Sequence, residues 1–286
     1  MAPEELRLDT RAGRFGGLAW RRPGAERILC VHGWLDNAAS FLPLAPLLDR
    51  YDIVALDLAG HGQSQHRPAG TRYHMVDNLW DLDAVLDALE WERCHLLGHS
   101  LGGVVTTTYA AAEPERVASL MVLDGLGPLS AAPGDTVPRL RRALHSVRKA
   151  SGRLRDYPDA EAAAQARHAA SGLPLDCARV ICSRALDEVG GVFRWRTDPA
   201  LNWHSPALLS EPQVREIIAA IQAPVLAINS TPVPDWIGPE RVADRVNSVL
   251  RLTRHEIAGH HHFHMDQPEP VAQWILEFLS AQEAAA

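Results

Sequence analysis

The stretch that decides the fold is residues 94–107, which read CHLLGHSLGGVVTT. An apolar run, Cys94–Leu97, leads into the pattern G-x-S-x-G with Ser100 at its centre, and Val104–Thr107 begins a helix-like sequence. A nucleophile on a sharp strand-to-helix turn is strained and leaves no room for side chains two residues away, so both flanking positions require glycine. The stretch therefore predicts a strand, a tight turn and a helix that present the Ser100 hydroxyl, rather than an ordinary glycine-rich turn.

Short apolar runs recur on both sides of this stretch. Continuous rather than alternating apolarity over four or five residues is typical of strands that are covered on both faces. The runs are Ile28–Val31, Ile53–Leu56, His95–Leu97, Leu120–Leu123 and Val225–Ile228. Helical spacing of apolar residues lies between them, at 76–89, and again at 271–279 after Pro268. The alternation predicts an α/β fold with a mostly parallel central sheet, helices on both faces and a site at the C-terminal strand ends.

An alanine- and arginine-rich stretch from Gly127 to Ile221 interrupts this rhythm. We interpret residues 127–221, called the inserted segment below, as a helical cap (lid), with residues 1–126 and 222–286 forming the core domain. A segment that leaves the sheet after Leu123 lies over the strand ends where Ser100 is expected. Its aromatic residues Phe193 and Trp195 are predicted to shape an apolar acyl pocket. The alternative is that they form the packing of the cap itself, with the neighbouring Arg194 and Arg196 at a solvated edge.

Composition excludes several classes of protein. The chain has 286 residues, 47% apolar and 22% charged, and a net charge of −7, so it folds and carries no global basic field for nucleic acid. Four scattered cysteines without a CxxC pair argue against a disulfide framework or a zinc ribbon. No apolar leader and no run of about 18 apolar residues is visible, so we expect a cytoplasmic protein without a membrane span. Oligomeric state cannot be predicted from these features.

A second motif, His32-Gly33-Trp34, closes the run Ile28–Val31. Its turn falls at the C-terminal end of a strand next to that of the nucleophile, where backbone N–H groups can point into the site. The N–H groups of Trp34 and Leu101 are predicted to form an oxyanion hole. We interpret His32 as a structural residue that ties the loop down, and expect Trp34 and His99 to contact substrate.

The third motif lies near the C-terminus, where residues 259–266 read GHHHFHMD. Four histidines in five positions resemble a metal cluster. Adjacent loop residues seldom converge on one ion, however, and no nearby cysteine or suitably spaced carboxylate pair completes a site, so the sequence predicts no metal. A general base is the better use, because a serine hydroxyl needs an imidazole within about 3 Å to take its proton.

These three motifs, in this order, resemble the α/β-hydrolase family. The turn Asp57–Ser64 is similar to a structural turn of that family, and residues 32–38 and 98–105 resemble the branch called serine hydrolase-like proteins. The resemblance implies that Ser100 is the nucleophile and that no cofactor is needed. The family ending G-x-H-x-x-H-x-x-x-P fits Gly259, His261, His264 and Pro268, which makes His261 the base and His260 the reserve.

The acid of the triad is less clear from the resemblance. Family members usually carry it after the strand that follows the insertion, but Val233 occupies the matching place here. Asp235 lies two residues further on. The alternative is Asp124, which ends the run Leu120–Leu123, where some small esterases of the family place their acid. We prefer Asp124, with Asp235 as the alternative.

The predicted function is a serine hydrolase of the carboxylesterase type, acting on a small carboxylic ester, with thioesters and lactones open. Related dehalogenases and epoxide hydrolases use an aspartate nucleophile, so Ser100 argues against both. A non-hydrolytic ligand receptor and a cofactor-free oxygenase or peroxidase remain alternatives on the same fold. The expected partner is a small acyl compound.

Overall fold

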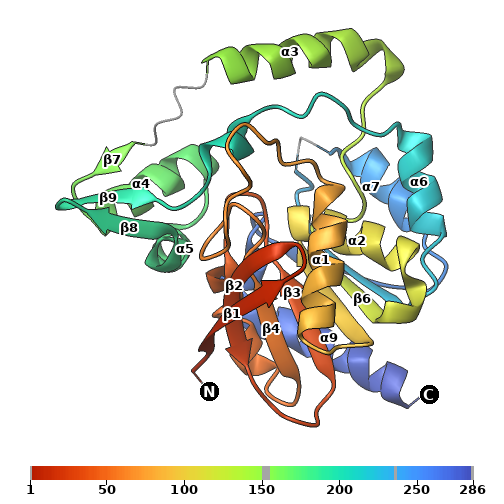
Figure 1. Cartoon of the computed structure of the whole chain (residues 1–286). Coiled ribbons are helices and arrows are strands. Elements are labelled where there is room, and N and C mark those ends of the chain that lie inside the picture. The colour runs from red at the N-terminus through yellow and green to blue at the C-terminus, as the bar shows by residue number, and fades with distance from the viewer. Residues whose placement is uncertain (1, 150–154, 235–236, 285–286) are drawn as a thin grey trace.

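A computed structural model describes residues 2–149, 155–234 and 237–284. Within these ranges, an eight-stranded sheet has the order β1-β2-β4-β3-β5-β6-β10-β11 (Figure 1). The strands are β1 (Glu4–Thr10), β2 (Gly13–Trp20), β3 (Arg27–Val31), β4 (Asp52–Leu56), β5 (Cys94–His99), β6 (Val117–Leu123), β10 (Val225–Thr231) and β11 (Leu252–Ala258). From β4 to β11 all neighbours pair in parallel, while β1 and β2 form an antiparallel hairpin at one edge. The predicted mostly parallel sheet is confirmed.

All five runs expected to be strands lie together in the middle of this sheet, as β4, β3, β5, β6 and β10. The three outer strands lack the signal used to find them. Exposed and partly buried residues alternate along most of β1, and β11 is largely exposed, because edge strands face water on one side. The strand β2 contains three glycines, which carry no apolar side chain.

Helices cover both faces of the sheet. On one face lie α1 (Asp77–Ala88), α2 (Leu101–Ala112) and α7 (Pro239–Val246), whose Val85, Val105 and Val246 join a buried apolar cluster. On the other lies α9 (Pro268–Glu283), with Val271 and Ile275 fully buried. Each such side chain contributes about 1.5–3 kcal/mol by leaving water. The sheet is therefore a rigid mount for residues at its strand ends.

The inserted segment leaves the sheet after β6 and returns at β10. Its helices are α3 (Thr136–Lys149), α4 (Ala160–Ser171), α5 (Leu175–Ala185) and α6 (Glu211–Ala219). The prediction of a purely helical segment missed a small sheet of order β7-β9-β8, made by β7 (Asp156–Tyr157), β8 (Leu186–Val189) and β9 (Val192–Trp195). These strands are only two to four residues long, which is too short for a periodic signal.

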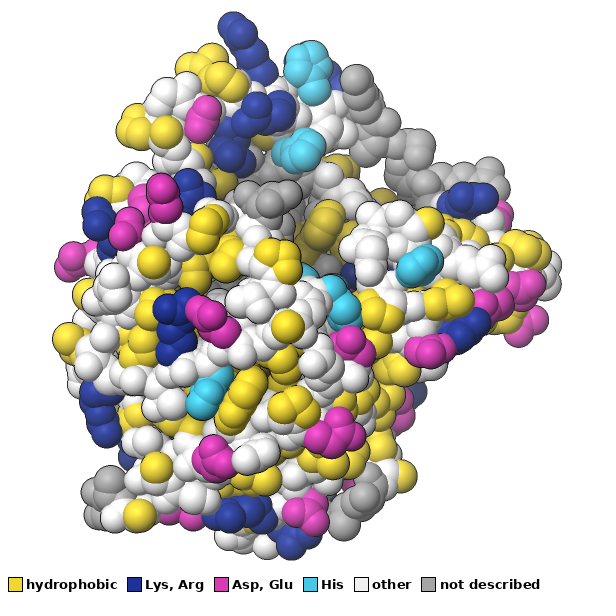
Figure 2. Space-filling view, turned by 180° about the vertical axis from the view of Figure 1, so that it is seen from behind, with side chains coloured by type: hydrophobic (Ala, Val, Ile, Leu, Met, Phe, Trp, Pro, Cys, Tyr) yellow, Lys and Arg dark blue, Asp and Glu magenta, His cyan; other side chains and the backbone are white. Residues whose placement is uncertain are grey.

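Helix α3 crosses the top of the molecule, apart from the main sheet (Figure 1). Its apolar residues Val137, Leu140 and Leu144 are spaced three and four apart, yet each is about half exposed. Dark-blue Lys and Arg side chains gather at the top of the view from behind, where α3 lies (Figure 2). The helix is thus amphipathic, with an apolar stripe that the described part of the chain leaves largely uncovered.

One arginine fixes both ends of the inserted segment. Arg245, on α7, is 1% exposed and donates hydrogen bonds to the carbonyl oxygens of Leu126 (3.0 Å), Gly127 (3.2 Å) and Pro128 (2.7 Å). The same guanidinium meets the carboxylate of Glu211, at the start of α6, at 2.8 and 2.9 Å. A buried guanidinium is costly unless its donors are paired, so these contacts define one arrangement. We call this group the Arg245 clamp.

Two further arginines of the inserted segment reach carboxylates of the core. Arg184, on α5, pairs with the buried Asp57 and with Glu5 of β1. Arg167, on α4, donates to Asp36 Oδ1 at 2.8 Å. The segment is thus fixed at its two ends and, through α4 and α5, along its length.

Across the part of the chain that the structure describes, no helix combines the length and the apolar content needed to cross a bilayer.

Candidate active site

Ser100 occupies the predicted sharp turn. It lies between β5 and α2 with φ 51° and ψ −114°, and its N–H donates to the carbonyl of Leu123 at 2.9 Å. A non-glycine residue in this region costs on the order of 1–3 kcal/mol and persists only where the surroundings enforce it. A Cβ at Gly98 would lie 2.4 Å from Thr106 Oγ1, and one at Gly102 would lie 1.9 Å from the carbonyl oxygen of Val31. The two glycines are therefore required by close packing, as the motif predicts.

His261 lies beside Asp124. Its Nδ1 is 3.0 Å from Asp124 Oδ2, although 137 residues separate the two in sequence. Asp124 follows β6, has φ 51° and is almost completely buried. Ser230 of β10 holds it with two donors: the N–H reaches Oδ1 at 2.8 Å and the hydroxyl donates to Oδ2. An ionised carboxylate only accepts, so this contact puts the imidazole proton on Nδ1 and makes Nε2 the basic nitrogen.

Two alternatives were predicted for this pair, Asp235 for the acid and His260 for the base. Asp235, the alternative acid, lies outside the described residues. The reserve base His260 pairs instead with Asp266, whose Oδ2 is 2.9 Å from His260 Nε2.

The loop of residues 259–264, called the histidine loop below, contacts the turn at Ser100 through His99, the residue before Ser100. Because a carbonyl oxygen only accepts, His99 Nε2 carries the proton and donates to the backbone oxygen of His261 at 2.9 Å. The two imidazole rings are 4.8 Å apart between centroids. The motifs at 98–102 and 259–264 are therefore brought together at one end of the sheet.

The predicted oxyanion donors are the N–H groups of Leu101, where a helix begins, and of Trp34, which follows a strand. Leu101 is the first residue of α2, where N–H groups have no partner within the helix. Trp34 follows β3; its side chain is half exposed, and its indole Nε1 donates to the carbonyl of Leu201 in the inserted segment at 3.2 Å. That these two N–H groups together form an oxyanion hole stays a prediction.

His32 has the structural role expected of it. The ring is completely buried, Nδ1 donates to the Gly33 carbonyl at 2.7 Å, and Nε2 accepts from the Leu58 N–H at 3.0 Å. Burial lowers its pKa, so the ring stays neutral as this pattern requires.

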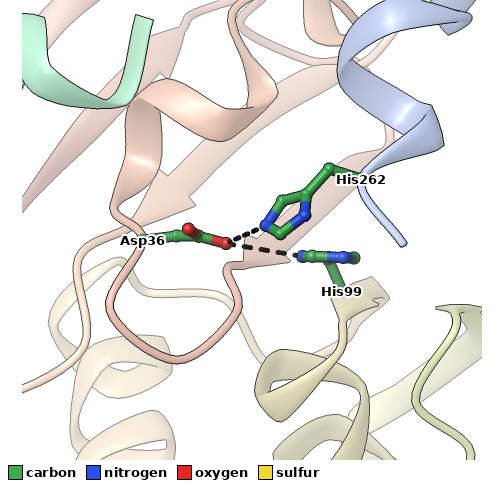
Figure 3. A group of neighbouring side chains, drawn as sticks. All are labelled: Asp36, His99 and His262. Atoms are coloured by element: carbon green, nitrogen blue, oxygen red, sulfur yellow. Dashed lines mark hydrogen bonds and ion pairs between the residues drawn. The ribbon is translucent and has the colours of Figure 1, made fainter. Parts of the chain in front are cut away.

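Sequence reasoning missed a second cluster beside the first (Figure 3). Asp36 Oδ2 lies 3.0 Å from His262 Nε2 and 3.7 Å from His99 Nδ1, and all three residues are buried. Burial alone would raise the pKa of Asp36, but the contact with His262 and the positive charge of Arg167 outweigh it and hold that pKa well below its usual range. Asp36 follows β3 and Ser100 follows β5, and the ends of these neighbouring parallel strands lie at the same edge of the sheet. This shared position is the sequence signal that could have identified the cluster.

His99, predicted to contact substrate, is fully buried within this histidine group. His264 is equally buried, with its ring 4.2 Å from that of His99. Burial first, and then the neighbouring histidines, lower the pKa of His99 well below its ordinary value. Its ring packs against the histidine loop, so a contact with substrate stays a prediction.

Phe193 and Trp195 lie on β9, partly buried against the apolar cluster of the inserted segment. The Trp195 ring makes an edge contact with Tyr157 at 6.4 Å. Arg194 pairs with Asp156 and Arg196 with Asp187, so both arginines have carboxylate partners in the same segment. These contacts match the alternative of internal packing; a role in an acyl pocket stays a prediction.

Comparison with known proteins gives consistent matches. The family model described as alpha/beta hydrolase fold matches residues 26–155. A serine hydrolase-like protein of Danio rerio is 30% identical over 98% of this chain and 90% of that protein. A crystal structure of a hypothetical protein from Pseudomonas aeruginosa has a TM-score of 0.88 and 33% identity, covering 98% and 99% of the two chains. A thioesterase domain from the curacin biosynthetic pathway has a TM-score of 0.83 and 25% identity, covering 96% and 100%.

Proposed function

The chain belongs to the α/β-hydrolase family, and from that premise we propose that it is a serine hydrolase that cleaves a small carboxylic ester through an acyl-enzyme on Ser100. The family and the relatives named serine hydrolase-like protein support hydrolase activity. The observation that carries the finer proposal is the 3.0 Å contact of His261 Nδ1 with Asp124 Oδ2, next to a strained serine.

In the proposed first half-reaction, Ser100 Oγ attacks the ester carbonyl carbon while His261 Nε2 takes the hydroxyl proton. The carbonyl oxygen becomes an oxyanion that accepts hydrogen bonds from the Leu101 and Trp34 N–H groups. Each such donor is worth about 10²–10³ in rate. His261 then gives its proton to the departing alcohol, which leaves Ser100 acylated. Water repeats the sequence, releasing the acid and restoring Ser100.

In this scheme Asp124 fixes the imidazole tautomer and stabilises the imidazolium that forms. Ser230 supports that role because its two donors hold the carboxylate in one orientation. Asp124 is thus the proposed acid, and the mechanism uses no cofactor.

We further propose that residues 127–221 act as a cap over the substrate, joined to the core residues 1–126 and 222–286. The hydrogen bond from Trp34 Nε1 to Leu201 supports this, since it joins the cap to the loop that carries an oxyanion donor. Phe193 and Trp195 belong to the cap and are the first positions to test for acyl-chain preference. Similarity to a thioesterase domain makes acyl thioesters the second substrate class to test, after esters.

The test is a turnover panel on the pure chain. p-Nitrophenyl esters of increasing acyl length and matching acyl thioesters are assayed with Ser100→Ala as the control, and a fluorophosphonate probe is used to label the serine. We expect many turnovers per chain and labelling that disappears in Ser100→Ala. Stoichiometric binding without sustained turnover would support a ligand receptor instead.

A further inference from the structure

We propose that Asp36, His99 and His262 form a binding site for one divalent transition-metal ion of the Zn²⁺ class, beside the Ser100, His261 and Asp124 group. The proposed hydrolysis needs no metal, so this site goes beyond that function. Zn²⁺ is bound in proteins by neutral imidazole nitrogen and carboxylate oxygen, which are the atoms that meet here (Figure 3).

The spacing of the three ligand atoms fits such an ion. With metal–ligand bonds near 2.0–2.1 Å in a tetrahedron, ligand atoms stand roughly 3.3 Å apart. Asp36 Oδ2 is 3.0 Å from His262 Nε2 and 3.7 Å from His99 Nδ1, and all three atoms lie within 4.8 Å of one another. The first two separations are within a few tenths of an ångström of this value, and the two imidazole nitrogens must approach each other by at most about 1.5 Å to hold an ion, with water in the fourth position.

The hydrogen bonding of His99 suits a metal ligand. Its Nε2 proton is donated to the His261 carbonyl, so Nδ1 presents a lone pair toward the Asp36 carboxylate. Two acceptors then face each other, and among the described residues this fully buried Nδ1 has no hydrogen-bond partner. A metal ligand whose other ring N–H donates to a backbone carbonyl is the usual arrangement around bound zinc.

Space between the ligands depends on Gly33. A Cβ at this position would lie 2.8 Å from Asp36 Oδ2 and 2.9 Å from His99 Nδ1. A methyl group would thus fill the place where the two ligands meet, whereas glycine leaves it open.

The remaining two contacts set the charge and the access of the site. His262 Nε2 now donates to Asp36; on binding, its proton moves to Nδ1 and the metal takes the lone pair. Arg167 occupies the other carboxylate oxygen, Oδ1, so the metal binds Oδ2 alone and feels a nearby positive charge. The His262 side chain is 11% exposed, against 1% for Asp36 and 0% for His99, so it is the ligand most open to solvent.

The sequence prediction of no metal rested on the adjacent histidines of the loop and on the lack of a nearby cysteine or suitably spaced carboxylate pair. Folding uses one histidine of that loop and adds a carboxylate from the turn after β3 and an imidazole from the end of β5. The three proposed ligands therefore come from three separate segments, not from adjacent residues of one loop.

The experiment is a titration of the chelator-stripped full chain with Zn²⁺ by calorimetry, and with Co²⁺ by visible absorption. We expect one high-affinity site per chain and the intense d–d bands of a tetrahedral Co²⁺ complex. His262→Ala and Gly33→Ala should each weaken binding by at least about tenfold. The matched control is His260→Ala, which removes a neighbouring histidine paired with Asp266 and should leave the affinity unchanged.

Failure to bind either metal would overturn the proposal, as would binding that is lost in His260→Ala and kept in His262→Ala. Arg167→Gln guards against variants that simply misfold, because removing the competing positive charge should tighten binding by about threefold or more. Weaker or unchanged binding in a folded Arg167→Gln chain also counts against the site. None of these measurements depends on ester hydrolysis, so the proposed function stands or falls separately.

Discussion

Two carboxylates flank the histidine loop, and each takes one of two consecutive histidines. Asp124 pairs with His261 and Asp36 pairs with His262, both at 3.0 Å. They differ in what else reaches the carboxylate: Asp124 is held by two donors of Ser230, whereas Asp36 is held by the charge of Arg167 from the inserted segment. An aspartate–histidine contact alone therefore does not identify a catalytic pair.

Exposure separates the two pairs further. The His261 side chain is 23% exposed and that of His262 is 11% exposed. A general base must reach substrate, while a buried pair in a polar network mainly fixes structure or holds a ligand. This difference supports the proposal that consecutive residues of one loop serve different purposes.

The largest expected difference is between the two histidines. His261→Ala should lower kcat by about 10⁶ because the nucleophile loses its base. His262→Ala should lower kcat by about tenfold, through a less well anchored loop. Steady-state kinetics on one ester measures both, with circular dichroism as the folding control; comparable losses would mean that the roles are wrongly divided.

The second-largest expected difference in kcat is between variants of the two carboxylates, Asp124 and Asp36. Asp124→Asn is expected to lower kcat by up to about 10⁴, because the amide can donate to Nδ1 and so favours the wrong tautomer. Asp36→Asn should cost about tenfold or less, with a lower free energy of unfolding because Arg167 loses its charged partner. Equal and mild effects on kcat would remove Asp124 from the triad and bring Asp235 back.

The free energy of unfolding should also depend on pH through His61, whose ring contacts Leu35, the residue before Asp36. Its Nε2 accepts the N–H of Leu35, and burial, followed by the nearby His32, lowers its pKa from 6.5 to about 3. The unfolded ring binds a proton below pH 6.5 whereas the folded ring does not, so stability is lost as the pH falls. Between pH 7.5 and 5 this group should cost about 2 kcal/mol.

His61→Gln should abolish that share of the pH dependence, since the amide oxygen can still accept the Leu35 N–H. Urea unfolding at both pH values gives the result directly. A variant whose stability changes with pH as steeply as the parent chain would exclude His61 as the source.

The smallest expected effects concern the supports of the two carboxylates. Ser230→Ala should lower kcat by about tenfold, because one hydrogen bond to the Asp124 carboxylate is lost while the N–H remains. Arg167→Gln should act mainly on stability, lowering the free energy of unfolding by about 1.5 kcal/mol. Kinetics and urea unfolding of both variants show whether Ser230, on the sheet, mainly affects the rate and Arg167, in the inserted segment, mainly affects stability.

The sequence was informative where one local pattern determines the structure. The turn around Ser100 and the five central strands follow from glycine spacing and from apolar runs, both of which are read within a few residues. The strands β1 and β11 were missed because edge strands do not need to be apolar on both faces, and β2 was missed because three of its residues are glycines. The small sheet around β9 was missed because its strands are too short to show a period.

The second aspartate–histidine pair was missed for a different reason. Asp36, His99 and His262 are far apart in the chain, and only the strand order brings their turns to one place. Asp124 was favoured because a strand end beside the nucleophile is a fixed position, and its contact with His261 depends on the same order. Asp235 is outside the described residues, so its comparison with Asp124 rests on the variants above.

The Arg245 clamp has a consequence for how this protein can vary. One guanidinium outside residues 127–221 binds the backbone at the start of that segment and the carboxylate of Glu211 at the start of α6, so a single core residue ties these two places together. We expect stretches in between that make no contact with the core to tolerate changes in length better than those around Arg167, Arg184 and Leu201, which do contact it. Under the proposal that this segment is a cap, substrate preference can diverge through changes within it while the residues at the strand ends stay the same.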